Sequence, residues 1–265
     1  MMDFRDDWDL ILLRLSTAPR LCILSDFDGT LVPIVERPDL VRLPSLVRRL
    51  LQSFARTGRC TAGIVSGRAL DDLVPRVSVE GIWYVGNHGF EMRSPTGAET
   101  RFFDGDDVQY VTQVRDELAI ETASIPGVLL EHKGPVVAVH YRMVEMPRAA
   151  EVERAFLRVM ERHRQRMMVA NGDRVFEARI RGIRNKGTAV RLIRRELPPG
   201  SLVIYFGDDI TDADAFRELR ATGIGVEVGS PGTTLAHYTL PDPSAVWESI
   251  QRILDAVDSE TSPRR

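Results

Sequence analysis

Short, uninterrupted apolar runs alternate with amphipathic segments over most of the chain. The runs are rich in branched side chains, which predicts strands buried on both faces of a sheet; they cover residues 21–24, 61–65, 82–85, 202–206 and 223–228. Between them, apolar residues recur at helical spacing and predict helices over 44–56, 69–74, 186–197, 211–219 and 244–257, the second ended by Pro75. Strands that alternate with helices predict an α/β fold with a Rossmann-like parallel sheet.

The pattern changes between residues 103 and 180. Helical spacing over 106–123 and again from Pro147 alternates with two hairpins, at 128–132 with 136–143 and at 167–170 with 174–180. The hairpin turns are predicted at 133–135 and 171–173, where Gly, Pro and Asn gather. We therefore expect residues 1–102 and 181–265 to form a discontinuous core, into which 103–180 are inserted as an α+β unit.

Composition limits the expected cellular location and binding partners of the protein. A formal net charge of -3 gives no basic surface for nucleic acid or an anionic membrane, so neither is an expected partner. The acidic start does not resemble a secretory signal, and no apolar run is long enough to span a bilayer. The two cysteines, Cys22 and Cys60, lie inside apolar runs and are expected to be buried thiols. These features favour a cytoplasmic protein.

Polar residues follow the ends of the predicted strands or begin the predicted helices. Parallel strands place their carboxyl ends, where ligands bind, at one edge of the sheet. Taken singly, each group has a structural alternative: Ser66 could cap a helix, Lys186 could be a solvated lysine, and the acids at 208–212 could favour a helix N-terminus. Their common edge favours a shared site instead. The groups are Asp26 with Asp28, Ser66, Lys186, and Asp208 with Asp209 and Asp212.

These residue types suit phosphoryl transfer. The carboxylates Asp26, Asp28 and Asp208 supply the hard oxygen ligands that Mg²⁺ prefers, whereas the chain's 5 histidines form no zinc-type cluster. A carboxylate held by a metal can attack phosphorus as a nucleophile. Ser66 and Lys186 can hold the phosphoryl oxygens as charge develops.

The same stretches resemble the four motifs of the haloacid dehalogenase superfamily. They read Asp26-Phe27-Asp28-Gly29-Thr30, Ser66-Gly67-Arg68, Lys186 and Gly207-Asp208-Asp209-Ile210-Thr211-Asp212. Their extended forms, with Gly86-Asn87-His88-Gly89-Phe90-Glu91 and Asn185-Lys186-Gly187, are similar to the trehalose-6-phosphate phosphatase family. The resemblance runs from about residue 21 to Trp247 and implies a core of the haloacid dehalogenase type, with the inserted unit as a cap for substrate specificity.

The resemblance also implies a role for each residue. Asp26 would be the nucleophile and Asp28 the general acid and base, with Ser66 and Lys186 completing the catalytic set. Asp26, Asp208 and the backbone carbonyl of Asp28 would bind Mg²⁺, supported by Asp209 and Asp212. Residues of two motifs and of the cap would bind the substrate: Gly67, Arg68, Asn87, His88, Glu131, Lys133, His140, Arg142 and Glu177. In the cap, strand alternation independently places Ala138, His140 and Arg142 opposite Val137, Val139 and Tyr141.

The leading hypothesis is a Mg²⁺-dependent, monomeric phosphatase that hydrolyses trehalose 6-phosphate through an aspartyl-phosphate. Its partner would be a small-molecule sugar phosphate, and a trehalose-phosphate synthase is a candidate protein partner. Alternatives are a phosphatase for a sucrose- or mannosyl-type phosphate, a mutase, or a silent sugar-phosphate sensor that regulates a synthase. The intact set of Asp26, Asp28, Lys186 and Asp208 argues against the sensor, which has no need of an acid and base.

Overall fold

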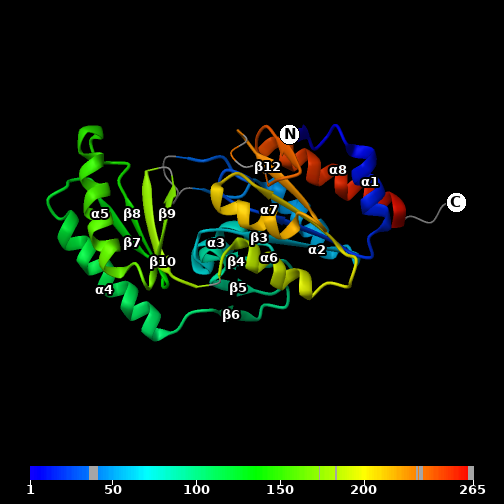
Figure 1. Cartoon of the computed structure of the whole chain (residues 1–265). Coiled ribbons are helices and arrows are strands. Elements are labelled where there is room, and N and C mark those ends of the chain that lie inside the picture. The colour runs from blue at the N-terminus through cyan, green and yellow to red at the C-terminus, as the bar shows by residue number, and fades with distance from the viewer. Residues whose placement is uncertain (36–40, 173, 183, 231, 233–234, 262–265) are drawn as a thin grey trace. The chain divides into compact units, whose positions relative to one another are not determined.

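The computed structural model describes residues 1–35, 41–172, 174–182, 184–230, 232 and 235–261, and the chain divides into two compact units. The first unit comprises residues 1–100 with 184–265, and the second comprises residues 101–183 (Figure 1). Asp173 of the predicted turn at 171–173 lies outside the described residues. No helix in the described part of the chain has both the length and the apolar character to cross a bilayer.

The first unit is built on a nine-stranded sheet in the order β1-β13-β12-β11-β2-β3-β4-β5-β6. The pairs from β1 to β4 are parallel, and β5 pairs with β4 in the antiparallel direction. The predicted α/β fold with a parallel sheet is therefore confirmed. The strands are β1 (Met2–Asp3), β2 (Leu21–Ser25), β3 (Cys60–Val65), β4 (Trp83–Gly86), β5 (Glu91–Arg93), β6 (Glu99–Arg101), β11 (Leu202–Gly207), β12 (Ile224–Val228) and β13 (Tyr238–Leu240).

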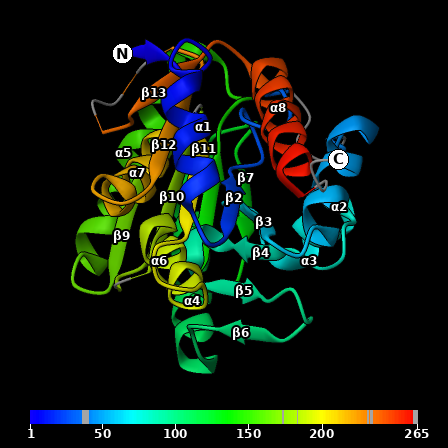
Figure 2. The same cartoon turned by 90° about the vertical axis from the view of Figure 1, so that its right-hand side faces the viewer.

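Helices cover this sheet, which explains the uninterrupted apolar runs. Every residue of β2, β3, β11 and β12 is buried, as expected for parallel strands covered on both faces. α8 packs against α1 and α2, whereas α6 packs against α7. Figure 2 shows α2 and α8 on one side of the strands and α6 and α7 on the other. The helices are α1 (Trp8–Thr17), α2 (Ser45–Arg56), α3 (Leu70–Val77), α6 (Lys186–Arg195), α7 (Ala213–Leu219) and α8 (Pro243–Thr261).

The second unit is a four-stranded antiparallel sheet with two long helices and a core of its own. The strand order is β7-β8-β10-β9, which fits the expected α+β insertion. Val137 and Val139 of the central strand are fully buried with Val114 and Phe156 of the helices. The elements are α4 (Gly105–Thr122), β7 (Leu129–His132), β8 (Val136–His140), η3 (Met146–Arg148), α5 (Ala149–His163), β9 (Met167–Gly172) and β10 (Val175–Ile180).

Several boundaries differ from the sequence predictions; the strand predicted over 167–170, for example, continues through two residues of the predicted turn to Gly172. α3 does not stop at Pro75 but continues to Val77, because the fixed φ of proline is helical. The helix ends only two residues later, in keeping with the lost N–H donor and the clash of the ring with the preceding turn. The strand predicted to reach residue 143 ends at His140, where Tyr141 N donates to Arg174 O and the chain turns. The sequence analysis also missed α1 and the short strands β1, β5, β6 and β13.

Candidate functional site

The carboxyl ends of β2 and β11 bring the first and last motifs together. The two strands are hydrogen-bonded neighbours, with Ser25 in register with Phe206. The Asp26 N–H continues this ladder by donating to Phe206 O at 2.8 Å. Asp26 therefore follows β2 beside the point where Asp208 follows β11, as expected for parallel strands.

The turn after Asp26 requires glycine because it lies against Asp208. Gly29 has a φ of 85°, and a Cβ built on it would lie 2.0 Å from Asp208 Oδ2. The next residue, Thr30, donates its hydroxyl to Asp208 Oδ1 at 2.7 Å. The turn thus approaches and orients the Asp208 carboxylate. Thr30 was not predicted as a site residue, although it stands in the first motif.

Lys186 lies between two buried carboxylates. Its Nζ is 3.0 Å from Asp26 Oδ1 and 2.7 Å from Asp212 Oδ1, and the three side chains are at most 7% exposed. Asn185 places the lysine by capping α6 through a hydrogen bond from Thr188 N to its side chain at 2.8 Å. The structure therefore brings together the lysine of the third motif and the carboxylates of the first and fourth.

Asp212 orients the lysine rather than facing open solvent. It is fully buried and also accepts from Tyr205 OH at 2.5 Å and from Asp209 N at 3.0 Å. Asp209 uses its own side chain to accept from Ile210 N. Tyr205 is a further site residue that the sequence analysis missed; the available signal was a tyrosine inside an otherwise apolar buried strand, where its hydroxyl requires a partner.

Burial of these acids makes their charges costly. Burial raises the pKa of Asp26, although the Lys186 ammonium opposes the shift. Burial likewise raises the pKa of Asp208 to about 6, against the opposing hydrogen bond from Thr30. Burial alone would lower the pKa of Lys186, but Asp212 and Asp26 outweigh it and raise that pKa. One lysine therefore leaves a local excess of negative charge.

A divalent cation fits this arrangement. One carboxylate oxygen each from Asp26, Asp208 and Asp212 lie within 4.8 Å of one another. The donors are all hard oxygens, and a divalent cation would offset the cost of charging Asp26 and Asp208, whose pKa values burial raises. Asp28 was also predicted to bind the metal, through its backbone carbonyl. Its carboxylate pairs with an arginine.

That arginine is Arg68. Its Nε and Nη2 donate to the two carboxylate oxygens of Asp28 at 2.6 and 2.8 Å, and its Nη1 donates to Asp72 Oδ2 at 2.8 Å. The Arg68 backbone N–H donates to Ser66 Oγ at 3.1 Å, which orients the hydroxyl at the end of β3. Arg68 was predicted to bind substrate, and the structure places its guanidinium on the predicted acid and base. Asp72 was not predicted.

A strained turn, η2 (Asn87–Gly89), packs against the Ser66 loop. Asn87 and His88 both have positive φ values, 46° and 55°. The N–H groups of Asn87 and His88 donate to Arg68 O at 2.8 Å and Ser66 O at 3.0 Å, respectively. A Cβ on Gly67 would lie 2.6 Å from His88 Nε2, so the imidazole requires glycine there. The structure thus places Ser66, Gly67, Arg68, Asn87 and His88 side by side.

The cap unit gathers most of its predicted residues on one face of its sheet. Glu131 and Glu177 are both in register with Ala138 of β8, and His140 is two residues further on the same face. Glu131 Oε2 is 2.9 Å from both His140 Nε2 and Lys133 Nζ. Burial would raise the pKa of Glu131, but the bond to His140 and the Lys133 charge outweigh it and lower that pKa to about 2. Arg142, predicted on the strand, lies in the turn beyond it.

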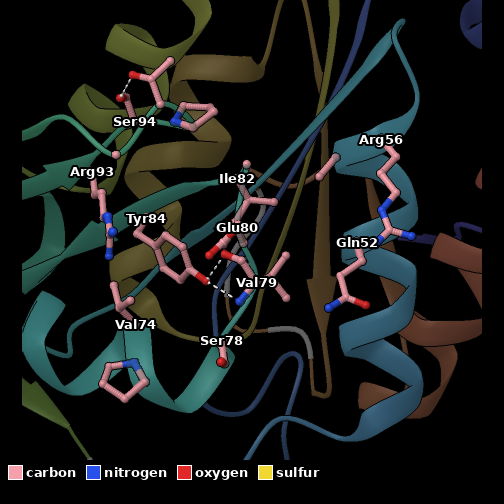
Figure 3. Close-up of a pocket in the computed structure, with 16 residues that line it drawn as sticks. Gln52, Arg56, Val74, Ser78, Val79, Glu80, Ile82, Tyr84, Arg93 and Ser94 are labelled. Atoms are coloured by element: carbon pink, nitrogen blue, oxygen red, sulfur yellow. Dashed lines mark hydrogen bonds between the residues drawn. The ribbon is translucent and has the colours of Figure 1, made fainter.

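A separate cleft of about 850 Å³ lies away from these carboxylates. It opens at the amino end of β4, whereas the acids and the lysine follow carboxyl ends or begin a helix at the opposite edge. Figure 3 shows Gln52 and Arg56 of α2 across the cleft from Arg93 and Ser94. This cleft therefore does not coincide with the acidic site.

Comparison with known proteins finds a family match and several relatives. The sequence profile of the trehalose-phosphatase family matches residues 24–244. A protein of Mycobacterium avium (strain 104) named trehalose-phosphate phosphatase is 36% identical over 248 residues, which are 89% of this chain and 62% of that protein. An uncharacterized glycosyl hydrolase of Mycobacterium tuberculosis (strain ATCC 25618 / H37Rv) is 37% identical over 229 residues, 82% of this chain but 17% of that protein. The chain thus spans less than two thirds of the length of either relative.

Solved structures show the same fold. The C-terminal domain of C. albicans trehalose-6-phosphate phosphatase superposes with a TM-score of 0.82 at 22% sequence identity, covering 93% of this chain and 96% of that one. At this identity the likeness concerns the fold alone. It extends over both compact units, since little of either chain is left unmatched.

Proposed function

Because this chain belongs to the trehalose-phosphatase family, we propose that it hydrolyses trehalose 6-phosphate to trehalose and inorganic phosphate. The family resemblance expected from the motifs is confirmed by the profile match and by the relatives. The observation that carries the proposed chemistry is the contact of Lys186 with both Asp26 and Asp212, beside Asp208. Such a lysine can stabilise a carboxylate nucleophile and an arriving phosphoryl group together.

Mg²⁺ is the proposed cofactor. Asp26 and Asp208 would hold it through their carboxylates, and Asp28 through its backbone carbonyl, while Asp212 orients Lys186. When bound, the ion would offset the negative charge of the acids and of the phosphoryl group. The all-oxygen donor set and the raised pKa values of Asp26 and Asp208 support this assignment.

Asp26 would act as the nucleophile. One of its carboxylate oxygens forms a bond to phosphorus while the bond from phosphorus to the sugar oxygen breaks, which yields an aspartyl-phosphate. Asp28 would give its proton to the departing oxygen and then accept one from the water that hydrolyses the aspartyl-phosphate. Lys186 and the Ser66 hydroxyl would hold the remaining phosphoryl oxygens during both steps.

In the cap, Glu131, Lys133, His140, Arg142 and Glu177 are proposed to bind hydroxyl groups of the sugar. Glu131, His140 and Glu177 share one face of the sheet, and Glu131 stays ionised even in mild acid because its pKa is lowered to about 2. A carboxylate of this kind accepts hydrogen bonds from sugar hydroxyls. The selection of trehalose 6-phosphate over other sugar phosphates is assigned to these residues.

The direct test is phosphate release from a panel of sugar and disaccharide phosphates, with Mg²⁺ and with EDTA. We expect turnover only with the metal and the largest kcat/KM for trehalose 6-phosphate. A preference for a sucrose- or mannosyl-type phosphate would refute the substrate but not the reaction. Transfer of labelled phosphate to product would indicate a mutase, and the absence of turnover from every ester would refute the enzymatic proposal.

A further inference from the structure

Arg68 belongs to a continuous row of alternating charges that leads away from the catalytic carboxylates. Its guanidinium bridges Asp28 and Asp72. Asp72 in turn accepts from Arg76 Nε at 2.8 and 2.9 Å through its two oxygens. Arg76 Nη1 donates to Val41 O at 3.0 Å, which ties the end of the row to the backbone. Of these residues, the proposed reaction assigns a proton-transfer role to Asp28 alone.

The geometry gives each member a fixed place. Arg68, Asp72 and Arg76 follow one another at intervals of four residues, so successive side chains meet along the start and face of α3. The two arginine side chains are each only 12% exposed, and the Arg68 guanidinium carbon lies 5.6 Å from the centre of the Phe27 ring. Asp72 is the member that bonds to both arginines. Without it, the Arg68 guanidinium would lose the ion pair that joins it to Asp72 on α3.

We propose that Asp72 is a positioning residue: it fixes the Arg68 guanidinium, which holds the Asp28 carboxyl group where it can give a proton to the leaving oxygen. This inference deepens the proposed function and rests on it. The arrangement matters because proton transfer depends on the distance and direction between donor and acceptor. Asp72 itself touches no reacting atom, so its effect must appear through Asp28.

The step at which Asp72 acts can be isolated chemically. As the Asp26 oxygen bonds to phosphorus, the ester oxygen leaves with the bonding electrons and takes the proton of Asp28. A sugar alkoxide is a poor leaving group and requires that proton, whereas p-nitrophenolate leaves readily as an anion. Because kcat/KM reports the steps through departure of the first product, a displaced acid lowers it for the sugar phosphate and spares it for p-nitrophenyl phosphate.

The experiment compares Asp72→Ala with Asp71→Ala, using trehalose 6-phosphate and p-nitrophenyl phosphate with Mg²⁺. Asp71 is the matched control because it is an exposed acid in the same first turn of α3, so both variants lose the same charge near the helix N-terminus. We expect Asp72→Ala to lower kcat/KM for the sugar phosphate on the order of tenfold and to leave p-nitrophenyl phosphate within about twofold of the control. Asp72→Glu should recover most of the loss.

Three outcomes overturn the inference. If Asp72→Ala lowers kcat/KM equally for both esters, Asp72 only supports the fold. If kcat/KM is unchanged for both, Arg68 is held in place without Asp72. If the unsubstituted protein releases phosphate from neither ester, the proposed function fails and the inference fails with it. The proposed function and the inference are both supported if the unsubstituted protein is active and Asp72→Ala lowers kcat/KM for the sugar phosphate but not for p-nitrophenyl phosphate.

Discussion

Replacing Lys186 by methionine tests whether the buried charges at the sheet edge are balanced as the structure indicates. The methionine side chain has nearly the length of lysine but carries no charge. In this protein the ammonium lies 3.0 Å from Asp26 and 2.7 Å from Asp212, and these carboxylates are 7% and 0% exposed. Lys186→Met therefore leaves two buried acids without their cation.

The expected cost follows from that burial. Breaking a buried ion pair by removing one partner costs about 3–5 kcal/mol, because the remaining charge stays out of water. Arg191→Met is the matched control on the same helix: its partner Glu218 lies 2.9 Å away, but the arginine side chain is 51% exposed. Loss of such a surface pair costs about 0–1 kcal/mol.

The assay is urea unfolding at pH 8 in EDTA, followed by far-UV circular dichroism. We expect the free energy of unfolding to fall several-fold more for Lys186→Met than for Arg191→Met. Adding Mg²⁺ should stabilise Lys186→Met more than the control, since the ion would supply positive charge to the same carboxylates. Equal destabilisation of the two variants would refute the view that Lys186 neutralises buried acids.

Three further changes probe other parts of the molecule. Asp26→Asn should abolish phosphate release while far-UV circular dichroism stays unchanged, and retained turnover would exclude Asp26 as the nucleophile. Gly29→Ala should destabilise the protein in urea by more than Gly97→Ala. Both glycines have positive φ values, 85° and 88°, where an alanine costs about 1–2 kcal/mol. Of the two, only Gly29 would place its Cβ against a neighbour, 2.0 Å from Asp208 Oδ2. Similar losses of stability in the two variants would argue against close packing of Gly29 on Asp208. Since its pKa is lowered from 4.5 to about 2, Glu131 should stabilise the cap above pH 4.5 and lose that effect as the pH falls toward 2. Glu131→Gln should flatten this dependence in urea melts at pH 7 and pH 3, by a modest amount because the side chain is 45% exposed, and an unchanged dependence would contradict the assignment.

The location of the candidate site could be predicted because it depends on topology more than on detail. Uninterrupted apolar runs identify parallel strands, and such strands deliver whatever follows them to one edge. Asp26 and Asp208 are separated by most of the chain, yet the neighbouring strands β2 and β11 place them side by side. Periodicity of the intervening segment was likewise enough to predict an α+β insertion.

The hydrogen-bond partners of individual side chains could not be predicted in the same way. A sequence shows that Arg68 stands near the site but not that its guanidinium lies on Asp28 and Asp72 instead of facing a ligand. The same holds for Asp212, which serves Lys186 and Tyr205 at once. Short strands were missed for another reason: β1 has 2 residues and β13 has 3, too few for a periodic pattern.

The crowding of acids at this edge predicts a specific conflict between stability and metal binding, centred on Asp208. Burial raises its pKa from 3.8 to about 6, so the folded protein disfavours the charged form. By linkage, the stabilising effect of the protonated acid is present below pH 3.8 and is lost as the pH rises through 6, a difference of at most about 3 kcal/mol. In EDTA, Asp208→Asn should therefore unfold at higher urea concentration than the unsubstituted protein at pH 8, and the difference should shrink toward pH 4. Mg²⁺ should reverse the order, because the amide is a weaker ligand. A destabilised Asp208→Asn in EDTA at pH 8 would mean that hydrogen bonding from Thr30, and not charge, dominates the energetics of this carboxylate.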